Sequence, residues 1–436
     1  MAKPILIAVA ALGISLFSSA CDSQPAPPDG AQTDGESVVE PGDTITILGT
    51  LTGVGEEKLR AAMAPFTEAT GVEVVYEGTD AFTTLVPVRV DSGNAPDIAL
   101  FPQPGLMLDF AEAGQMVPLT AFMDREPLRE AYNDYLLELV SVEDDIYGLW
   151  MRADVKSLVW YNPEAFAAQG YTVPTTWDEM MALTDQIVAD GGVPWCIGME
   201  SGKATGWVGT DWIEAILVQQ AGPEVYDQWV NRDIPFADAQ VKSAFETFGE
   251  IAQNPDYVYG GATGVISTPF GDAPRPLFDE PPGCYMHRQA SFIVEFLPEN
   301  VEPGTNLGVF PLPPIDPDQG SAVLMGGILF GVFNDTPAVQ ALMEYLATPA
   351  PHEIWAGLGS YISPHQQVSL EAYPDDLTRR QAEILQEADV LRFDGSDLMP
   401  GAVGTGTFWS GIVDYVTGQD LDTILEDIDA SWPSEQ

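Results

Sequence analysis

One stretch of the sequence decides the fold: Ser92-Gly93-Asn94-Ala95-Pro96-Asp97-Ile98-Ala99-Leu100-Phe101-Pro102-Gln103-Pro104-Gly105. Residues 92–97 are typical of a turn, and the short apolar run at 98–101 predicts a buried strand of a mostly parallel sheet. The prolines that follow end the strand, and a helix begins at 106–110. Because ligands of open α/β sheets bind beyond the carboxyl ends of the strands, Phe101 and Gln103 are candidate ligand contacts. An ordinary strand-to-helix connection with a buried Phe101 is the structural alternative.

The segments around this stretch alternate between strand and helix patterns. Before it, the sequence predicts a strand at 44–48, a helix at 56–70, a strand at 71–76 and a helix at 82–90. This βαβαβ order favours a parallel sheet with right-handed crossovers. After it, strands are expected at 146–150, 157–161, 194–199 and 325–333, and a surface loop at 255–282. Helices are expected at 177–190, 211–221, 238–252, 337–346, 374–388, 408–417 and 421–430, the first of them introduced by the capping box Thr176-Trp177-Asp178-Glu179.

Length and charge limit the classes of function. A chain of 436 residues suggests two or three packed units. Its 66 acidic and 16 basic side chains give a formal net charge of −50. Such a surface repels phosphate backbones, which excludes a nucleic-acid partner. The even spread of the acidic residues along the chain favours a protein that stays soluble in a salty medium.

The N-terminus has the pattern of an export signal. A basic start precedes an apolar run at 4–17, and small residues lead to Cys21. This end resembles a bacterial lipoprotein signal, in which the cysteine carries lipid, although Ser18 stands where leucine is common. Residues 1–20 are therefore predicted to be a signal peptide, Cys21 a lipidation site, and 21–43 a disordered tether to the cell membrane.

The three cysteines can be accounted for in one way. If Cys21 carries lipid, Cys196 and Cys284 remain, and an exported chain favours a disulfide between them. Two buried free thiols are the alternative.

The motifs of common enzymes and metal sites do not occur in this sequence, whereas tryptophans recur beside polar residues near turns. Arg152 follows Trp150, Asp211 follows Trp207, and Trp409 closes a glycine-rich segment. Aromatic faces pack on the C–H faces of sugar rings, while carboxylate, amide and guanidinium groups bind hydroxyls. A core position is the alternative for each tryptophan taken alone.

Several motifs in order resemble a known family. They are Ser-Gly-x-x-Pro-Asp-Ile at 92–98, Ala-Gly-Gln-Met-Val-Pro-Leu at 113–119, Val-Trp-Tyr-Asn-Pro-Glu-Ala-Phe at 159–166 and Val-Pro-Thr-Thr-Trp-Asp-Glu at 173–179. The chain from about residue 44 onward resembles the extracellular solute-binding proteins of ABC importers, family 1, in the maltose-binding class. Pro-Trp-Cys-Ile-Gly at 194–198, Ala-Thr-Gly-Trp at 204–207 and Arg-Phe-Asp-Gly-Ser-Asp-Leu-Met-Pro at 392–400 resemble the α-glucoside-binding branch.

The resemblance implies an α/β fold of the periplasmic-binding-protein type II, with two lobes and a ligand cleft between them. Each lobe is expected to contain a mostly parallel sheet flanked by helices. The first lobe is expected to span 44–153 and 324–380, and the second lobe 154–323 and 381–436. Hinge crossings are expected near 152–156, 311–323 and 374–389.

The resemblance also implies binding residues. Phe101 and Trp409 occupy positions that present aromatic rings to sugar, and Phe292 replaces a tryptophan of the family pattern. Arg152, Trp207 and Asp211 lie beside segments that carry ligand contacts. The expected protein is a monomeric, non-enzymatic receptor without cofactor or metal, outside the cytoplasmic membrane. It would deliver an oligosaccharide or glycoside to an ABC permease.

Two other functions fit parts of the sequence. An acidic cleft with aromatic walls could bind a polyamine or a cationic osmolyte, because cation–π contacts also use aromatic rings. An exported glycoside hydrolase needs only two suitably spaced carboxyl groups.

Overall fold

The computed structural model describes residues 39–316 and 322–433. The predicted signal peptide, the lipidation site Cys21 and most of the predicted tether lie outside these residues. Within the described part of the chain, no helix is long and apolar enough to cross a membrane.

The first sheet begins with three parallel strands, as predicted. Strand β1 (Thr44–Gly49) pairs with β2 (Glu73–Gly78) on one side and with β3 (Ile98–Phe101) on the other. Helices α1 (Val54–Thr70) and α2 (Phe82–Asp91) form the crossovers. Because all four residues of β3 are buried, its run of apolar residues does not alternate with polar ones.

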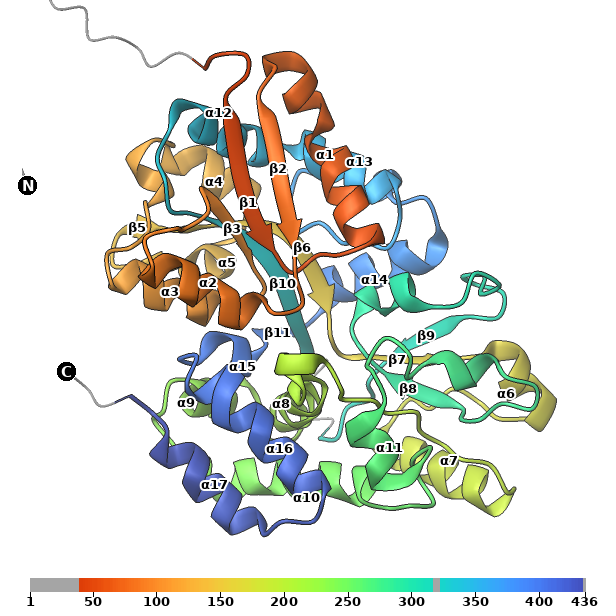
Figure 1. The fold of residues 1–436 in the computed structure, drawn as a ribbon. Coiled ribbons are helices and arrows are strands. Elements are labelled where there is room, and N and C mark those ends of the chain that lie inside the picture. Colours follow the sequence, from red (N-terminus) through yellow and green to blue (C-terminus); the bar gives the residue numbers. More distant parts are fainter. Residues whose placement is uncertain (1–38, 317–321, 434–436) are drawn as a thin grey trace, which may run out of the picture. The chain divides into compact units, whose positions relative to one another are not determined.

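The other half of this sheet is mixed, not parallel. The fully buried strand β10 (Ala322–Val332) runs antiparallel to β3 and to β6 (Gly148–Val155), and parallel to β11 (Val390–Phe393). In Figure 1, β10 runs through the middle of the sheet. The chain re-enters this sheet at the end toward which β1 and β3 point, and β10 therefore runs antiparallel to β3. The expected parallel pairing is found for β1–β2, β1–β3 and β10–β11, and the two antiparallel pairs of this sheet both involve β10.

The second sheet corrects the prediction further, because both of its strand pairs are antiparallel. Strand β7 (Leu158–Tyr161) lies between β8 (Met286–Arg288) and β9 (Gly308–Pro311). Parallel neighbours would need helical crossovers that return the chain to the starting edge of β7. In this protein the helical segment between β7 and β8 returns the chain to the end of β7, not to its start. Strand β8 therefore runs antiparallel to β7.

Helices form most of the second lobe. Helix α8 (Trp207–Ala221) is buried over most of its length and packs against α10 (Ala239–Ala252) and α16 (Trp409–Val416). A separate apolar core surrounds it, distinct from the core around the first sheet. We call the six-stranded sheet with its helices the first lobe, and the three-stranded sheet with the helices around α8 the second lobe.

Local sequence signals placed most helices correctly. The Thr176 hydroxyl accepts the Glu179 N–H at 3.2 Å and begins α7 (Trp177–Ala189). Helices α12 (Pro337–Leu346), α14 (Asp376–Glu387) and α17 (Leu421–Ala430) also match. The remaining elements are α3 (Pro104–Glu112), α4 (Arg125–Ala131), α5 (Asp134–Glu138), β4 (Ser141–Val142), β5 (Asp145–Ile146), α6 (Pro163–Gln169), α9 (Pro223–Val230), α11 (Gly261–Ser267), α13 (Pro349–Gly357) and α15 (Gly395–Leu398).

Two local predictions are wrong. The segment 194–199 forms only isolated bridges, from Trp195 to Val258 and Met286, because its neighbours contact it one residue at a time. The predicted loop at 255–282 contains α11, whose glycine-rich sequence hides its helical pattern. The predicted disulfide between Cys196 and Cys284 is present, with the two Cα atoms 5.6 Å apart.

The chain passes between the lobes near the predicted positions in two cases. β6 leads into β7 through Lys156, and β9 leads toward β10 through a segment that is only partly described. The third expected crossing, near 374–389, is instead helix α14. Strand β11 pairs in the first sheet, and the chain enters α15 through Asp394.

Candidate functional site

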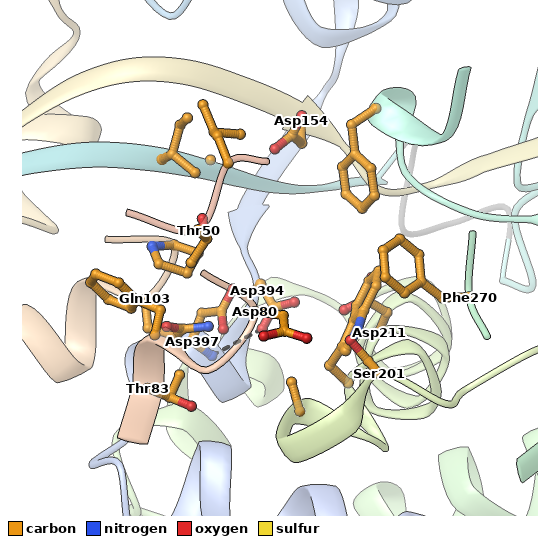
Figure 2. Close-up of a pocket in the computed structure, with 18 of the residues that line it drawn as sticks. Thr50, Asp80, Thr83, Gln103, Asp154, Ser201, Asp211, Phe270, Asp394 and Asp397 are labelled. Atoms are coloured by element: carbon orange, nitrogen blue, oxygen red, sulfur yellow. Dashed lines mark hydrogen bonds between the residues drawn. The ribbon is translucent and has the colours of Figure 1, made fainter. Parts of the chain in front are cut away.

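A cavity of about 330 Å³ lies where the two lobes and the crossing segments meet. Its walls come from the loops after β1 and β3, the end of β6, the start of α8, the segment after β8, and α15 with the start of α16. In Figure 2, Gln103 and Asp397 lie at one side of the cavity and Phe270 at the other. This volume is at the lower end of the range for small-molecule sites, which favours a small ligand.

Aromatic rings form one wall. The ring centroid of Trp207 lies 5.2 Å from that of Phe270 and 5.9 Å from that of Phe292. Trp409, which is only 4% exposed, lines the same cavity. These flat apolar faces, beside polar groups, match the two kinds of surface that a sugar ring presents.

A buried lysine joins the crossing segments. The Lys156 ammonium lies 3.0 Å from Asp211 Oδ1 in α8, forms an ion pair with Asp394, and lies 3.8 Å from Asp397 Oδ2. Burial by itself would lower the pKa of Lys156, but these carboxylates raise it well above its usual value. The lysine therefore stays charged and links β6, α8 and α15.

The pKa values of the acidic groups around Lys156 are shifted in different directions. Burial by itself would raise the pKa of Asp394, but Lys156 and hydrogen bonds to its carboxylate bring the pKa below its usual value. Burial raises the pKa of Asp211 to about 7, although Lys156 opposes the shift. Burial, followed by the charge of Asp394, raises the pKa values of Asp397 and Glu214 well above normal.

Hydrogen bonds fix the start of α15 within this network. Asp394 Oδ1 accepts the Asp397 N–H at 3.0 Å and caps the helix. The Glu214 carboxyl group accepts the N–H groups of Gly395 and Ser396, at 2.8 and 3.1 Å. Arg288 donates to the Asp211 carbonyl at 2.8 Å. Lys156 and Arg288 supply two positive charges among these buried carboxyl groups, which are held by ion pairs and hydrogen bonds in place of water.

The second cation of the cavity is also paired. Arg152 Nε lies 3.0 Å from Asp154 Oδ1, and the side chains of both residues are about 7% exposed. Its guanidinium carbon lies 5.7 Å from the ring centroid of Phe292. Arg152 therefore holds the aromatic wall in place while its charge is compensated.

Three buried polar atoms of the lining make no hydrogen bond within the described residues: Gln103 Oε1 and Asp211 Oδ2, which are acceptors, and Trp409 Nε1, a donor. A buried polar atom without a hydrogen bond is costly. A ligand with hydroxyl groups supplies donors for the two acceptors and an acceptor for the indole N–H.

The structure brings six of the seven predicted ligand contacts to this cavity: Gln103, Arg152, Trp207, Asp211, Phe292 and Trp409. Their contact with a ligand stays a prediction. Phe101 does not line the cavity. Its ring is fully buried and lies 5.3 Å from the Phe82 ring and 6.2 Å from the Phe110 ring, centroid to centroid. The placement of Phe101 at the ligand is corrected, because alternate side chains of a strand point to opposite faces and this one faces the core.

Sequence reasoning missed Lys156, Asp394 and Asp397. Lys156 lies in the range expected for a crossing, and both aspartates lie in the Arg-Phe-Asp-Gly-Ser-Asp motif. The spacing of an Asp three residues before another is a helix N-cap signal that could have marked Asp394. Nothing local indicates that Lys156 contacts residues more than 230 positions away.

The fold and cavity define the class of protein, and the comparisons agree. The family model for bacterial extracellular solute-binding proteins matches residues 49–353. The chain belongs to this family, whose members are receptors of ABC importers and not enzymes.

Two relatives match over most of their length. The osmoprotective compounds-binding protein GgtB of Synechocystis sp. is 57% identical over 389 residues, covering 89% of this chain and 92% of that protein. The alpha-glucosides-binding periplasmic protein AglE of Rhizobium meliloti is 41% identical over 403 residues, covering 90% of this chain and 88% of that protein.

Solved structures share the fold at low sequence identity. The bacterial solute receptor AcbH has a TM-score of 0.77 at 17% identity, covering 89% of this chain and 98% of AcbH. RafE in complex with raffinose has a TM-score of 0.69 at 19% identity, covering 89% of this chain and 98% of RafE. These structures support the two-lobed α/β architecture.

Proposed function

We propose that this receptor captures a small, neutral glycoside of the α-glucoside or osmoprotectant type and delivers it to its ABC permease. The observation that carries the proposal is the meeting of aromatic rings and unpartnered buried polar atoms in one cavity of about 330 Å³. The relatives GgtB, which binds osmoprotective compounds, and AglE, which binds alpha-glucosides, point to the same class of ligand.

The contacts that the cavity offers are consistent with the binding free energy of a micromolar complex. A micromolar dissociation constant corresponds to about 8 kcal/mol. Aromatic stacking adds about 0.5–1.5 kcal/mol per ring beyond area burial, and Trp207, Phe292 and Trp409 offer three rings. Hydrogen bonds to Gln103 and Trp409 would remove the cost of leaving their buried atoms unpaired. We infer that closure of the first lobe on the second lobe brings these groups onto the ligand. Strand β11 (Val390–Phe393), expected in the second lobe, belongs to the first.

Trp409→Ala tests the assignment. We expect at least tenfold weaker binding of glucosylglycerol or a neutral α-glucoside by calorimetry, with the cooperative unfolding transition retained. Trp432→Ala is the matched control, because Trp432 does not line the cavity and packs against Arg232. Unchanged affinity in Trp409→Ala would reject the placement of the ligand at this wall.

A cationic ligand is the competing outcome. The acidic lining favours it, but Lys156 and Arg152 already pair with Asp211, Asp394 and Asp154. A thermal-shift screen with neutral oligosaccharides, glucosylglycerol and spermidine decides between them. Binding of spermidine that is lost in 1 M salt, with no response to sugars, would replace the glycoside proposal. Release of sugar from α- and β-glucosides would reveal a hydrolase.

We also propose that the receptor is a monomer anchored to the cell membrane through lipid on Cys21, with 21–43 as its tether. The support is the sequence of the export signal. Cys21→Ser should release the protein from the membrane fraction. Persistence of that variant in the membrane fraction would reject the anchor.

A further inference from the structure

Building on the proposed function, we propose that the cavity selects neutral glycosides against anionic ones, and that Asp80 at the cavity lining helps to set this selection. The ligand class is thereby narrowed to compounds without carboxylate, phosphate or sulfate groups. Three observations carry the inference. Among the described residues, the basic side chains of the lining already form ion pairs, the Asp80 carboxylate forms none, and the buried atoms without a hydrogen bond include both acceptors and a donor.

Both basic side chains that line the cavity already form ion pairs with acidic side chains. Lys156 is 6% exposed and its ammonium contacts Asp211 and Asp394. Arg152 is equally buried and pairs with Asp154. An anionic ligand would find no uncompensated cation among the lining residues, and moving a carboxylate out of water without such a partner is costly.

Asp80 adds a repulsive element. It lines the cavity, is exposed, and makes no ion pair or side-chain hydrogen bond within the described residues. Figure 2 draws Asp80 among the side chains that line the cavity. A like charge on the ligand would face it directly, and an unpaired charge of this kind is a common means of rejecting a wrong ligand.

The unpartnered atoms favour hydroxyl groups. Gln103 Oε1 and Asp211 Oδ2 are buried acceptors that need a donor, whereas Trp409 Nε1 needs an acceptor. A hydroxyl group can donate and accept, but an ionised carboxylate can only accept. A carboxylate placed here would therefore leave Gln103 Oε1 unpaired.

The test compares glucosylglycerol with glucosylglycerate, which differ only in that one CH₂OH group becomes a carboxylate. Calorimetry at pH 7.5 is expected to show at least 100-fold weaker binding of the anion. Asp80→Asn should reduce this ratio at least threefold, as should 1 M NaCl on the native protein, because Asp80 is exposed to screening. Asp91→Asn is the matched control: Asp91 is an exposed aspartate at the other end of α2, outside the cavity, and should leave the ratio unchanged.

The outcomes separate the two proposals. Equal affinity for the two compounds overturns the selection while leaving the proposed function intact. An unchanged ratio in Asp80→Asn overturns the role of Asp80. Binding of neither compound nor any other neutral glycoside overturns the proposed function, and this inference with it.

Discussion

Replacing Lys156 by methionine should destabilise the receptor more than any surface charge change. Methionine keeps much of the length and packing of the side chain but removes the ammonium group. Asp211 and Asp394, which are 0% and 1% exposed, then lose the cation that they contact. Removing one partner of a buried ion pair costs about 3–5 kcal/mol, because the other charge remains buried. We expect a loss of this size in the free energy of unfolding.

The loss should depend on pH in a definite direction. Lys156 keeps the pKa of Asp394 below its usual value, and without the cation burial will raise it. An acid whose pKa is higher in the folded state binds a proton there that the unfolded chain releases, so stability falls as pH rises. The difference between the native protein and Lys156→Met should therefore be smaller at pH 5 than at pH 8.

Urea unfolding at both pH values measures the effect, with constant m-values as the check on two-state behaviour. Lys242→Met is the matched control, since Lys242 also forms an ion pair, with Asp422, but at the exposed surface. We expect a far smaller change there. Adding Asp394→Asn to Lys156→Met should restore part of the loss. Equal losses for the two lysines, or a loss that does not vary with pH, would refute the reasoning.

Three further changes test the packing and the ionisation of the site. In Gly105→Ala, the new Cβ would lie 2.6 Å from two backbone carbonyl oxygens at the end of α15, so α3 must move away and we expect weaker ligand binding by calorimetry. Gly357→Ala is the control and should bind normally, because its Cβ meets nothing within 4 Å. Thr176→Ala removes the cap of α7 and should lower the free energy of unfolding by about 0.5–2 kcal/mol in urea titrations, and an unchanged midpoint would contradict the capping role. Burial raises the pKa of Asp211 from 3.8 to about 7, so the folded protein holds a proton on Asp211 that the unfolded chain releases. The stability that this proton contributes is complete below pH 3.8 and is lost as the pH rises to about 7. The free energy of unfolding measured from pH 4 to 7 should show this slope, and Asp211→Asn should flatten it.

Local signals explain why much of the fold could be predicted. The turn at 92–97 and the apolar run after it define β3, and the crossovers around it follow from chain connectivity. The Thr176 cap and the apolar stripes of α12 and α17 define helices through contacts only three or four residues apart. The directions of β8, β9 and β10 could not be predicted, because they depend on the end of the sheet at which a distant segment arrives.

The sequence by itself determined the class of the protein and the residue types of its site. It placed Gln103 after a strand, tryptophans beside polar groups, and two cysteines that pair. The tertiary structure alone decided which of these side chains share a cavity. It buried Phe101 in a core, and it placed Lys156 against Asp211 and Asp394. The physical reason is that ion pairing and burial depend on distances between segments far apart in the chain, which local residue patterns do not encode.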